Sequence, residues 1–154
     1  MIREFSAGGV LVRRLRGRFV VAAIRPGGKP PGVWALPKGL VGAGEKPEET
    51  ALREVAEETG VEATSLGKLG DVRYVYTRGG ERVFKVVSFY LLRYRRGRLG
   101  DLPPELAFEV AEARWLAADE APRLLAYKGE REMADRALAR LREGAYDLRS
   151  AAAP

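Results

Sequence analysis

The sequence predicts an α/β (α+β) fold in which a mixed β-sheet lies between helices. Runs typical of strands are separated by two segments with helical periodicity, over residues 47–59 and 130–143. With 154 residues and 46% hydrophobic content, the chain can bury a core of its own. We therefore expect a single domain over residues 1–149 and a frayed tail at 150–154.

Three strands are expected before the first helix. Phe5 to Arg13 and Arg18 to Arg25 form two strands joined near Gly17. The second run is almost continuously apolar, so it should occupy a central position in the sheet. Residues 26–32 form a loop because they are rich in proline and glycine. A short strand from Val33 to Pro37 then leads toward the helix.

The first helix carries an acidic face. It begins at Pro47, whose missing N–H costs nothing in a first turn, and ends at Gly60. At about 100° per residue, Glu54, Glu57 and Glu58 fall within an arc roughly 100° wide. Carboxylates three and four residues apart repel one another, so a divalent cation among them is the simplest explanation. The opposite arc carries Ala51, Leu52, Val55, Ala56 and Thr59.

A hairpin and a further strand follow this helix. Lys68 to Thr77 and Arg82 to Tyr94 alternate in polarity around a turn at residues 78–81. Residues 101–108 contain two adjacent prolines and form a loop. A strand over Val110 to Leu116 comes next.

The end of the chain predicts two helices. Asp119 is the expected N-cap of a short helix from Glu120 to Ala126. A final helix is expected from Glu130 to Glu143 because its apolar residues recur with helical spacing. This apolar stripe consists of Met133, Ala134, Ala137, Leu138 and Leu141.

The residue types present limit the kind of metal. The chain contains no histidine and no cysteine, which removes the ligands that zinc, copper and iron sites usually use. Only oxygen ligands remain, and these suit Mg²⁺ or Mn²⁺. Magnesium sites commonly combine one or two carboxylates with phosphate oxygens of a substrate. The acidic face therefore indicates a phosphate-containing substrate.

The segment from Gly39 to Val61 resembles the complete Nudix box. Residues 34–39 and 6–10 are also similar to members of this family. The resemblance implies the Nudix α/β/α sandwich and Mg²⁺-dependent cleavage of a pyrophosphate bond in a nucleoside diphosphate linked to another group. The residues that match the box are Gly39, Glu45, Arg53, Glu54, Val55, Glu57, Glu58, Gly60 and Val61.

The resemblance also implies roles for the acidic residues. Glu57 and Glu58 are the expected metal ligands, and the carbonyl of Gly39 is a further candidate ligand. Glu54 either ligates metal or accepts the proton of the attacking water. In a chain without histidine, a carboxylate is the natural general base.

Other box residues are expected to position the reacting groups. Arg53 lies one helical turn from Glu57 and can orient carboxylates by a bidentate contact, the alternative being an ordinary surface ion pair. Glu45 is implied to fix the junction of loop and helix or to bind a further metal. Lys38 is placed to meet a substrate phosphate as a point charge.

Outside the box the candidates are weaker. In several Nudix subfamilies a glutamate before a late strand supplies an accessory ligand or base, and Glu109 best matches that position. Glu105 and Glu112 are competitors, and a loop residue without chemistry is the alternative.

Aromatic side chains suggest where a nucleobase could bind. Tyr74, Tyr76 and Tyr127 carry rings that could stack on a base. For each of these tyrosines, ordinary packing in the core or on the surface is the alternative.

The substrate class is indicated by the hairpin region. Residues 69–94 contain tyrosines and the run that begins at Lys85, and no proline occurs between Pro47 and Pro103. This resembles diadenosine polyphosphate hydrolases more than ADP-ribose pyrophosphatases. It implies a dinucleoside polyphosphate substrate, with Tyr76 and Lys85 among the substrate-binding residues. Nucleoside triphosphates, RNA ends, ADP-ribose and a non-catalytic nucleotide sensor are the alternatives.

Net charge and hydropathy limit the kinds of partner that we expect. The net charge of +6 attracts polyanions or serves solubility, and we expect a nucleic acid partner only if RNA ends are substrates. The longest apolar runs are too short to span a bilayer, so we expect no membrane partner, a cytoplasmic location, and a monomer or homodimer. The chain has no asparagine or glutamine, which is a thermophile tendency.

Overall fold

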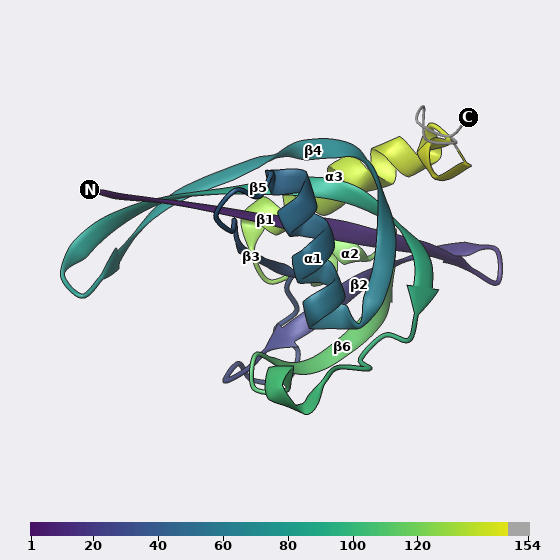
Figure 1. The fold of residues 1–154 in the computed structure, drawn as a ribbon. Helices are drawn as coiled ribbons and strands as arrows, with labels where there is room; N and C mark the ends of the chain where they lie inside the picture. The colour runs from purple at the N-terminus through teal and green to yellow at the C-terminus, as the bar shows by residue number, and fades with distance from the viewer. Residues whose placement is uncertain (148–154) are drawn as a thin grey trace.

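A computed structural model describes residues 1–147, so the tail predicted at 150–154 lies outside the described part (Figure 1). One sheet has the strand order β4-β5-β1-β2-β6, and β3 pairs with β1. The β1–β5 pair is parallel, and the other pairs are antiparallel. The strands are β1 (Ile2–Leu15), β2 (Arg18–Pro26), β3 (Lys38–Leu40), β4 (Val61–Arg78), β5 (Glu81–Gly97) and β6 (Val110–Ala117).

Helices cover both faces of this sheet. Helix α1 (Pro47–Thr59) lies in front of the sheet in Figure 1, and α3 (Lys128–Arg142) lies behind it. Helix α2 (Ala121–Leu124) packs beside α3, and the short 3-10 helices η1 (Pro104–Leu106) and η2 (Ala145–Asp147) flank β6 and α3. The α/β/α prediction is confirmed. Within residues 1–147, no helix combines the length and the hydrophobicity needed to cross a membrane.

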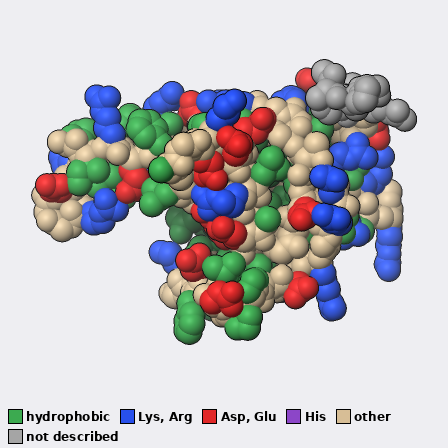
Figure 2. Space-filling view, in the orientation of Figure 1, with side chains coloured by type: hydrophobic (Ala, Val, Ile, Leu, Met, Phe, Trp, Pro, Cys, Tyr) green, Lys and Arg blue, Asp and Glu red, His purple; other side chains and the backbone are tan. Residues whose placement is uncertain are grey.

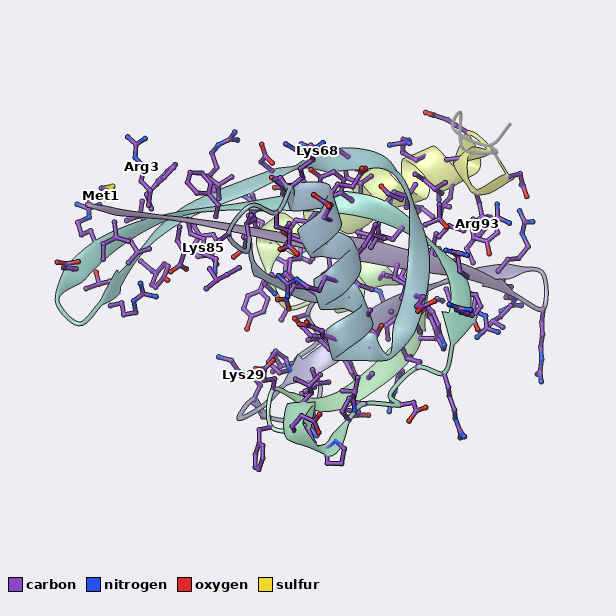
Figure 3. The ribbon with its side chains drawn as sticks, in the orientation of Figure 1. Met1, Arg3, Lys29, Lys68, Lys85 and Arg93 are labelled. Atoms are coloured by element: carbon purple, nitrogen blue, oxygen red, sulfur yellow. The ribbon has the colours of Figure 1, made fainter. Side chains whose placement is uncertain are left out.

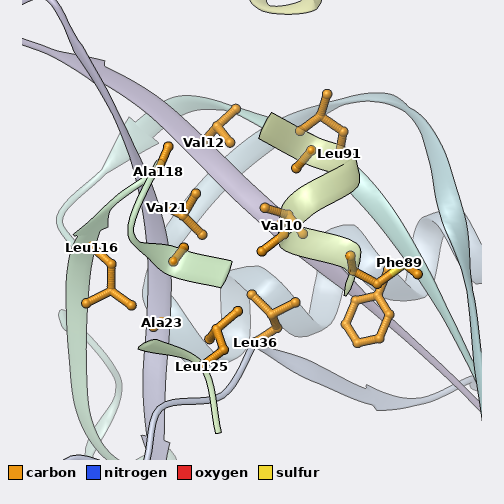
Figure 4. Packing of buried hydrophobic residues seen from close by; sticks show 14 of the residues in the cluster. Val10, Val12, Val21, Ala23, Leu36, Phe89, Leu91, Leu116, Ala118 and Leu125 are labelled. Atoms are coloured by element: carbon orange, nitrogen blue, oxygen red, sulfur yellow. The ribbon is translucent and has the colours of Figure 1, made fainter. Parts of the chain in front are cut away.

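The alternation of side chains along the central strands explains the two cores. On β1, Ala7 and Leu11 pack toward α1, whereas Val10 and Val12 pack toward α3. Figure 4 shows the larger cluster, which Phe89 joins from β5. A sheet covered on both faces requires apolar residues at successive positions. The prediction that the second strand is central is confirmed, because β2 pairs with β1 and β6.

The first helix begins and ends where the sequence predicted. Pro47 occupies the first helical turn, and the Glu49 carboxylate accepts a hydrogen bond from the Lys46 N–H at 2.9 Å. Gly60 terminates the helix in the left-handed conformation with φ of 81°. The side chain of another residue there would meet the backbone of the loop at 98–101.

Several predicted strand boundaries are wrong. Residues 33–37 form no strand; only Trp34 and Ala35 make single bridges, and the strand β3 starts at Lys38. The strand expected to begin at Lys68 begins at Val61. It was missed because bulges near residues 62–70 interrupt its pairing with β5, so its side chains do not alternate regularly there.

The last helices also differ from the prediction. The short helix spans only Ala121–Leu124, and Glu120, not Asp119, occupies the N-cap position. The final helix starts two residues earlier than expected, at Lys128. Leu138 is only partly buried at the edge of the larger core, whereas Glu130 is buried.

Replacing Leu91 tests the larger core. Leu91→Ala should lower the free energy of unfolding by about 2–5 kcal/mol, because Leu91 is fully buried and the substitution leaves a cavity. Leu40→Ala is the matched control, since Leu40 is 55% exposed. Urea unfolding of both variants checks this, and equal losses in the two variants would contradict the packing described here.

Candidate active site

Glu58 is the most buried carboxyl group of α1, with only 8% of the residue exposed. One of its oxygens accepts a hydrogen bond from the Lys38 N–H at 3.3 Å. The pKa of Glu58 is raised to about 8, mainly by burial and also by the charge of Glu54, while the charge of Lys38 opposes both. The metal-free protein therefore carries a proton on Glu58 near neutral pH.

The three carboxyl groups of the acidic face differ in exposure. The side chain of Glu57 is 42% exposed, and that of Glu54 is 14% exposed. The three carboxyl groups share one side of the helix, but they lie at different depths. The backbone before and within β3 covers one edge of that side and takes Glu58 out of water.

Gly39 lies directly against Glu54. A Cβ atom at position 39 would overlap the carboxyl group of Glu54. Only glycine therefore lets β3 approach the acidic face this closely. This contact gives a structural reason for the first glycine of the box.

Arg53 lies among the carboxylates and binds three of them. Its guanidinium donates hydrogen bonds to Glu45 at 2.7 and 2.9 Å, to Glu54 at 2.8 Å and to Glu57 at 3.2 Å. Figure 2 shows basic side chains among the acidic ones over α1. The chain thus supplies positive charge itself, so repulsion among the glutamates does not by itself require a metal. The bidentate contact expected for Arg53 is made with Glu45.

Glu45 ties the loop before α1 to the helix. Its carboxylate accepts hydrogen bonds from the Gly42 N–H at 3.0 Å and from the Thr50 hydroxyl at 2.7 Å. The hydrogen bond from Arg53 is the main cause that lowers the pKa of Glu45 to about 2, and the bonds from Thr50 and Gly42 add to it. These contacts match the junction role expected for Glu45.

The candidate metal ligands on α1 have the chemistry that a hard cation needs, but they are not arranged as a metal site. All of them are oxygens, and Glu54 and Glu58 interact closely enough to raise the pKa of Glu58. Across the described part of the chain, however, no three acidic side chains are gathered as a metal site would require. Glu57 is held by Arg53. Completing a site requires Glu57 to leave this ion pair.

A cleft of about 740 Å³ opens between β4, β5 and the start of α3. Its walls include Tyr74 and Tyr127, and Glu130 and Lys38 also line it. Lys38 joins the cleft to the acidic helix, because its backbone N–H contacts Glu58 while its ammonium contacts Glu130.

Glu130 was missed in the sequence as a candidate site residue. It lies on α3 and is 5% exposed. A signal was available, since Glu130 stands three, four and seven residues before Met133, Ala134 and Ala137 and so falls on the buried stripe of the helix. A charged residue on such a stripe indicates a buried, partnered carboxylate.

Two predicted substrate-binding residues lie elsewhere. Tyr76 donates a hydrogen bond to Glu4 at 2.9 Å, and Lys85 pairs with the same carboxylate at 3.2 Å. Figure 3 labels Lys85 on the part of the β4–β5 hairpin that projects past α1, and Tyr76 pairs with Val83, two residues nearer the hairpin turn. Neither residue lines the cleft, although the Tyr76 ring lies 6.0 Å from that of Tyr74.

The candidates before and within β6 do not line the cleft either. Glu109 and Glu105 are exposed in the loop that contains η1. The backbone carbonyl of Glu109 accepts a hydrogen bond from Gly27 at 3.0 Å. Glu112 pairs with Arg25 at 3.3 Å.

Comparison with known proteins identifies the family. The profile of the NUDIX domain matches residues 3–137, so the chain belongs to the Nudix family. It is 41% identical over 138 residues to a protein of Mycobacterium tuberculosis named "Putative mutator protein MutT4", covering 87% of this chain. It is 37% identical over 95 residues to the bis(5'-nucleosyl)-tetraphosphatase [asymmetrical] of Rattus norvegicus, covering 62% of this chain.

The solved structures agree with the fold. The Ap4A hydrolase of C. elegans in a binary complex matches 91% of this chain and 98% of its own, with a TM-score of 0.69 and 23% identity. This likeness shows the Nudix fold. The chain spans 54% of the length of the mycobacterial relative and 63% of the rat enzyme.

The raised pKa of Glu58 predicts a pH dependence of stability. The folded, metal-free protein binds this proton more tightly than the unfolded chain does, so its contribution is full below the ordinary pKa of 4.5 and is lost as the pH rises toward 8. Urea unfolding in chelator from pH 5 to 8 checks this. Glu58→Gln should flatten the profile, and an equally steep decline in that variant would contradict the assignment.

The approach of Gly39 to Glu54 gives a second prediction. Gly39→Ala should destabilise the protein by about 1–3 kcal/mol, because overpacking displaces the carboxyl group of Glu54. In a Glu54→Ala background the same change should cost much less, since the obstructing group is gone. Urea unfolding of the three variants checks this, and additive losses would contradict the contact.

Proposed function

We propose that this protein is a pyrophosphohydrolase that cleaves a nucleoside diphosphate linked to another group, with a dinucleoside polyphosphate as its substrate class. The observation that carries the proposal is the junction at Lys38 and Gly39. Lys38 reaches a tyrosine-walled cleft, and both residues contact paired carboxylates of α1. Membership of the Nudix family supports the reaction class.

Nudix hydrolases generally use divalent metal ions, and we propose Mg²⁺, or Mn²⁺ in its place, for this chain. Glu54, Glu57, Glu58 and the Gly39 carbonyl would hold it. A divalent ion there would neutralise phosphate oxygens and lower the pKa of the attacking water. Arg53 orients the carboxylates through its bonds to Glu54 and Glu57.

Residues of the chain also serve the proton transfer and the substrate. Glu54 accepts the proton of the attacking water in this proposal, since it lies beside Gly39 and Glu58. We retain Glu109 as a candidate accessory base, because it is exposed to solvent. Lys38 meets a substrate phosphate. Tyr76 and Lys85 could contact only a distal part of a long substrate, because they lie on the β4–β5 hairpin outside the cleft.

The cleft supports a nucleotide as the bound group. Its volume of about 740 Å³ lies within the usual range for small-molecule sites. The rings of Tyr74 and Tyr127 are about 40% exposed and border it, so they are available to stack on a base. The name of the rat relative supports a dinucleoside polyphosphate. A nucleotide substrate also supports a cytoplasmic location.

One observation favours a second function, a nucleotide sensor without turnover. In residues 1–147 the acidic side chains are not gathered as a metal site would require, and Arg53 binds three of them. Such an arrangement is stable without metal. Nucleotide binding with no cleavage of any substrate would support the sensor.

Turnover distinguishes the two functions. The protein should release nucleotide products in Mg²⁺ or Mn²⁺ from a panel of dinucleoside polyphosphates, ADP-ribose, nucleotide sugars, nucleoside triphosphates and triphosphorylated RNA. We expect the fastest cleavage with a dinucleoside polyphosphate. Chromatography of the products checks this, and fastest cleavage of RNA ends would instead make nucleic acid the partner.

A pair of variants on α1 is the control for this assay. Glu57→Gln should lower kcat by at least about 100-fold, because it removes a proposed metal ligand. Glu48→Gln makes the same charge change in the exposed first turn and should keep kcat within about twofold of the wild type. Unchanged turnover in Glu57→Gln would remove Glu57 from the ligand set.

A further inference from the structure

Glu130 connects the start of α3 to the segment that precedes the Nudix helix. Its Oε1 accepts a hydrogen bond from the Leu36 N–H at 2.7 Å, and its Oε2 pairs with the Lys38 ammonium at 2.8 Å. The residue is 5% exposed and lies beside the cleft. Burying a charged carboxylate costs free energy of desolvation, and a hydrogen bond and an opposite charge such as these offset that cost.

The segment 35–38 is held from three sides. Ala35 exchanges two backbone hydrogen bonds with Ile24, each 2.8 Å long. The next two available backbone donors, those of Leu36 and Lys38, point to carboxylates of two different helices, Glu130 of α3 and Glu58 of α1. Pro37, between them, has no N–H to place. The backbone that carries Lys38 is therefore fixed on both faces of the sheet.

The side chain of Lys38 is fixed as well. Its ammonium donates to the Leu36 carbonyl at 3.1 Å and to Glu130 at 2.8 Å. An ammonium has three donors, so one N–H remains for another acceptor. The side chain is 27% exposed and lines the cleft. The remaining donor is accordingly available to a ligand there.

We propose that Glu130 is a positioning residue that holds the Lys38 ammonium ready for a phosphate oxygen of the substrate. This inference rests on the proposed function, because it assigns Lys38 to the polyphosphate. Glu130 acts through Lys38 and touches no substrate phosphate itself. Its negative charge repels phosphate, so its benefit comes from fixing a long side chain before binding.

Glu130 has two opposing effects on phosphate binding: it fixes the Lys38 side chain, and its negative charge repels phosphate. These two effects can be separated. A free lysine side chain loses much rotamer freedom when it binds, and Glu130 has already removed that freedom. With Lys38 present, we expect this ordering to outweigh the repulsion. With Lys38 removed, only the repulsion remains. The effect of replacing Glu130 should therefore depend on the residue at position 38.

A double-mutant cycle tests this dependence. Inorganic tripolyphosphate is titrated into the protein in Mg²⁺ by calorimetry, since every candidate substrate shares its chemistry. Glu130→Gln should weaken binding about tenfold, which corresponds to about 1.4 kcal/mol. In a Lys38→Met background the same change should cause no further loss. Equal losses in both backgrounds, or no loss in the wild type, would overturn the inference.

Two further variants keep the result interpretable. Asp135→Asn makes the same charge change at an exposed position of α3 that does not line the cleft, and it should keep the affinity within about twofold. Glutamine at 130 keeps an acceptor for Leu36, and thermal unfolding monitors the fold. If Glu130→Gln does not fold, Glu130→Asp replaces it in the cycle, because its shorter side chain withdraws from Lys38. A loss in Asp135→Asn as large as that of Glu130→Gln would overturn the inference.

This measurement separates the inference from the proposed function. Binding is observed without turnover, so a protein that binds tripolyphosphate and cleaves no nucleotide overturns the proposed function alone. A wild-type protein that does not bind tripolyphosphate overturns the role of Glu130.

Discussion

The close approach of residues 36–39 to the carboxyl groups of two helices is the constraint on which the site depends. Gly39 lies against Glu54 because it has no side chain, and Lys38 donates its N–H to Glu58. The same short segment reaches Glu130 on the other side of the sheet. Residues far apart in the chain are thereby placed at one junction between the acidic helix and the cleft. A small displacement of this segment would separate the groups proposed to act together.

Arg53 makes this arrangement stable in the absence of metal. One guanidinium binds carboxylates that would otherwise repel one another, and Glu45 anchors it through two hydrogen bonds. The bond between them is also the largest single cause of the low pKa of Glu45. Because Glu57 is held in the same network, the proposed metal site and the ion-pair network compete for one side chain. This competition links metal binding to a local rearrangement on α1.

The sequence predicted what depends on local patterns. Pro47 and Gly60 marked the ends of α1 correctly, because both residues act through their own backbone geometry. The layers of helix and sheet were predicted from the periodic spacing of apolar residues. The burial of Glu58 and the identity of the partners of Glu130 could not be predicted in this way, since each depends on a segment that reaches it from another part of the chain. Tyr76 and Lys85 were predicted from likeness to a family, and their contact with Glu4 is likewise a long-range one.

The proposed reaction requires a divalent ion bound between the carboxyl groups of α1 and the backbone of Gly39. Anomalous diffraction from a crystal soaked in Mn²⁺ tests this most directly, because it locates the ion without relying on activity. We expect a peak beside Glu54 and Glu58, with the Glu57 carboxylate turned away from Arg53. An absence of Mn²⁺ at this position, with Arg53 still bound to Glu57, would contradict the account.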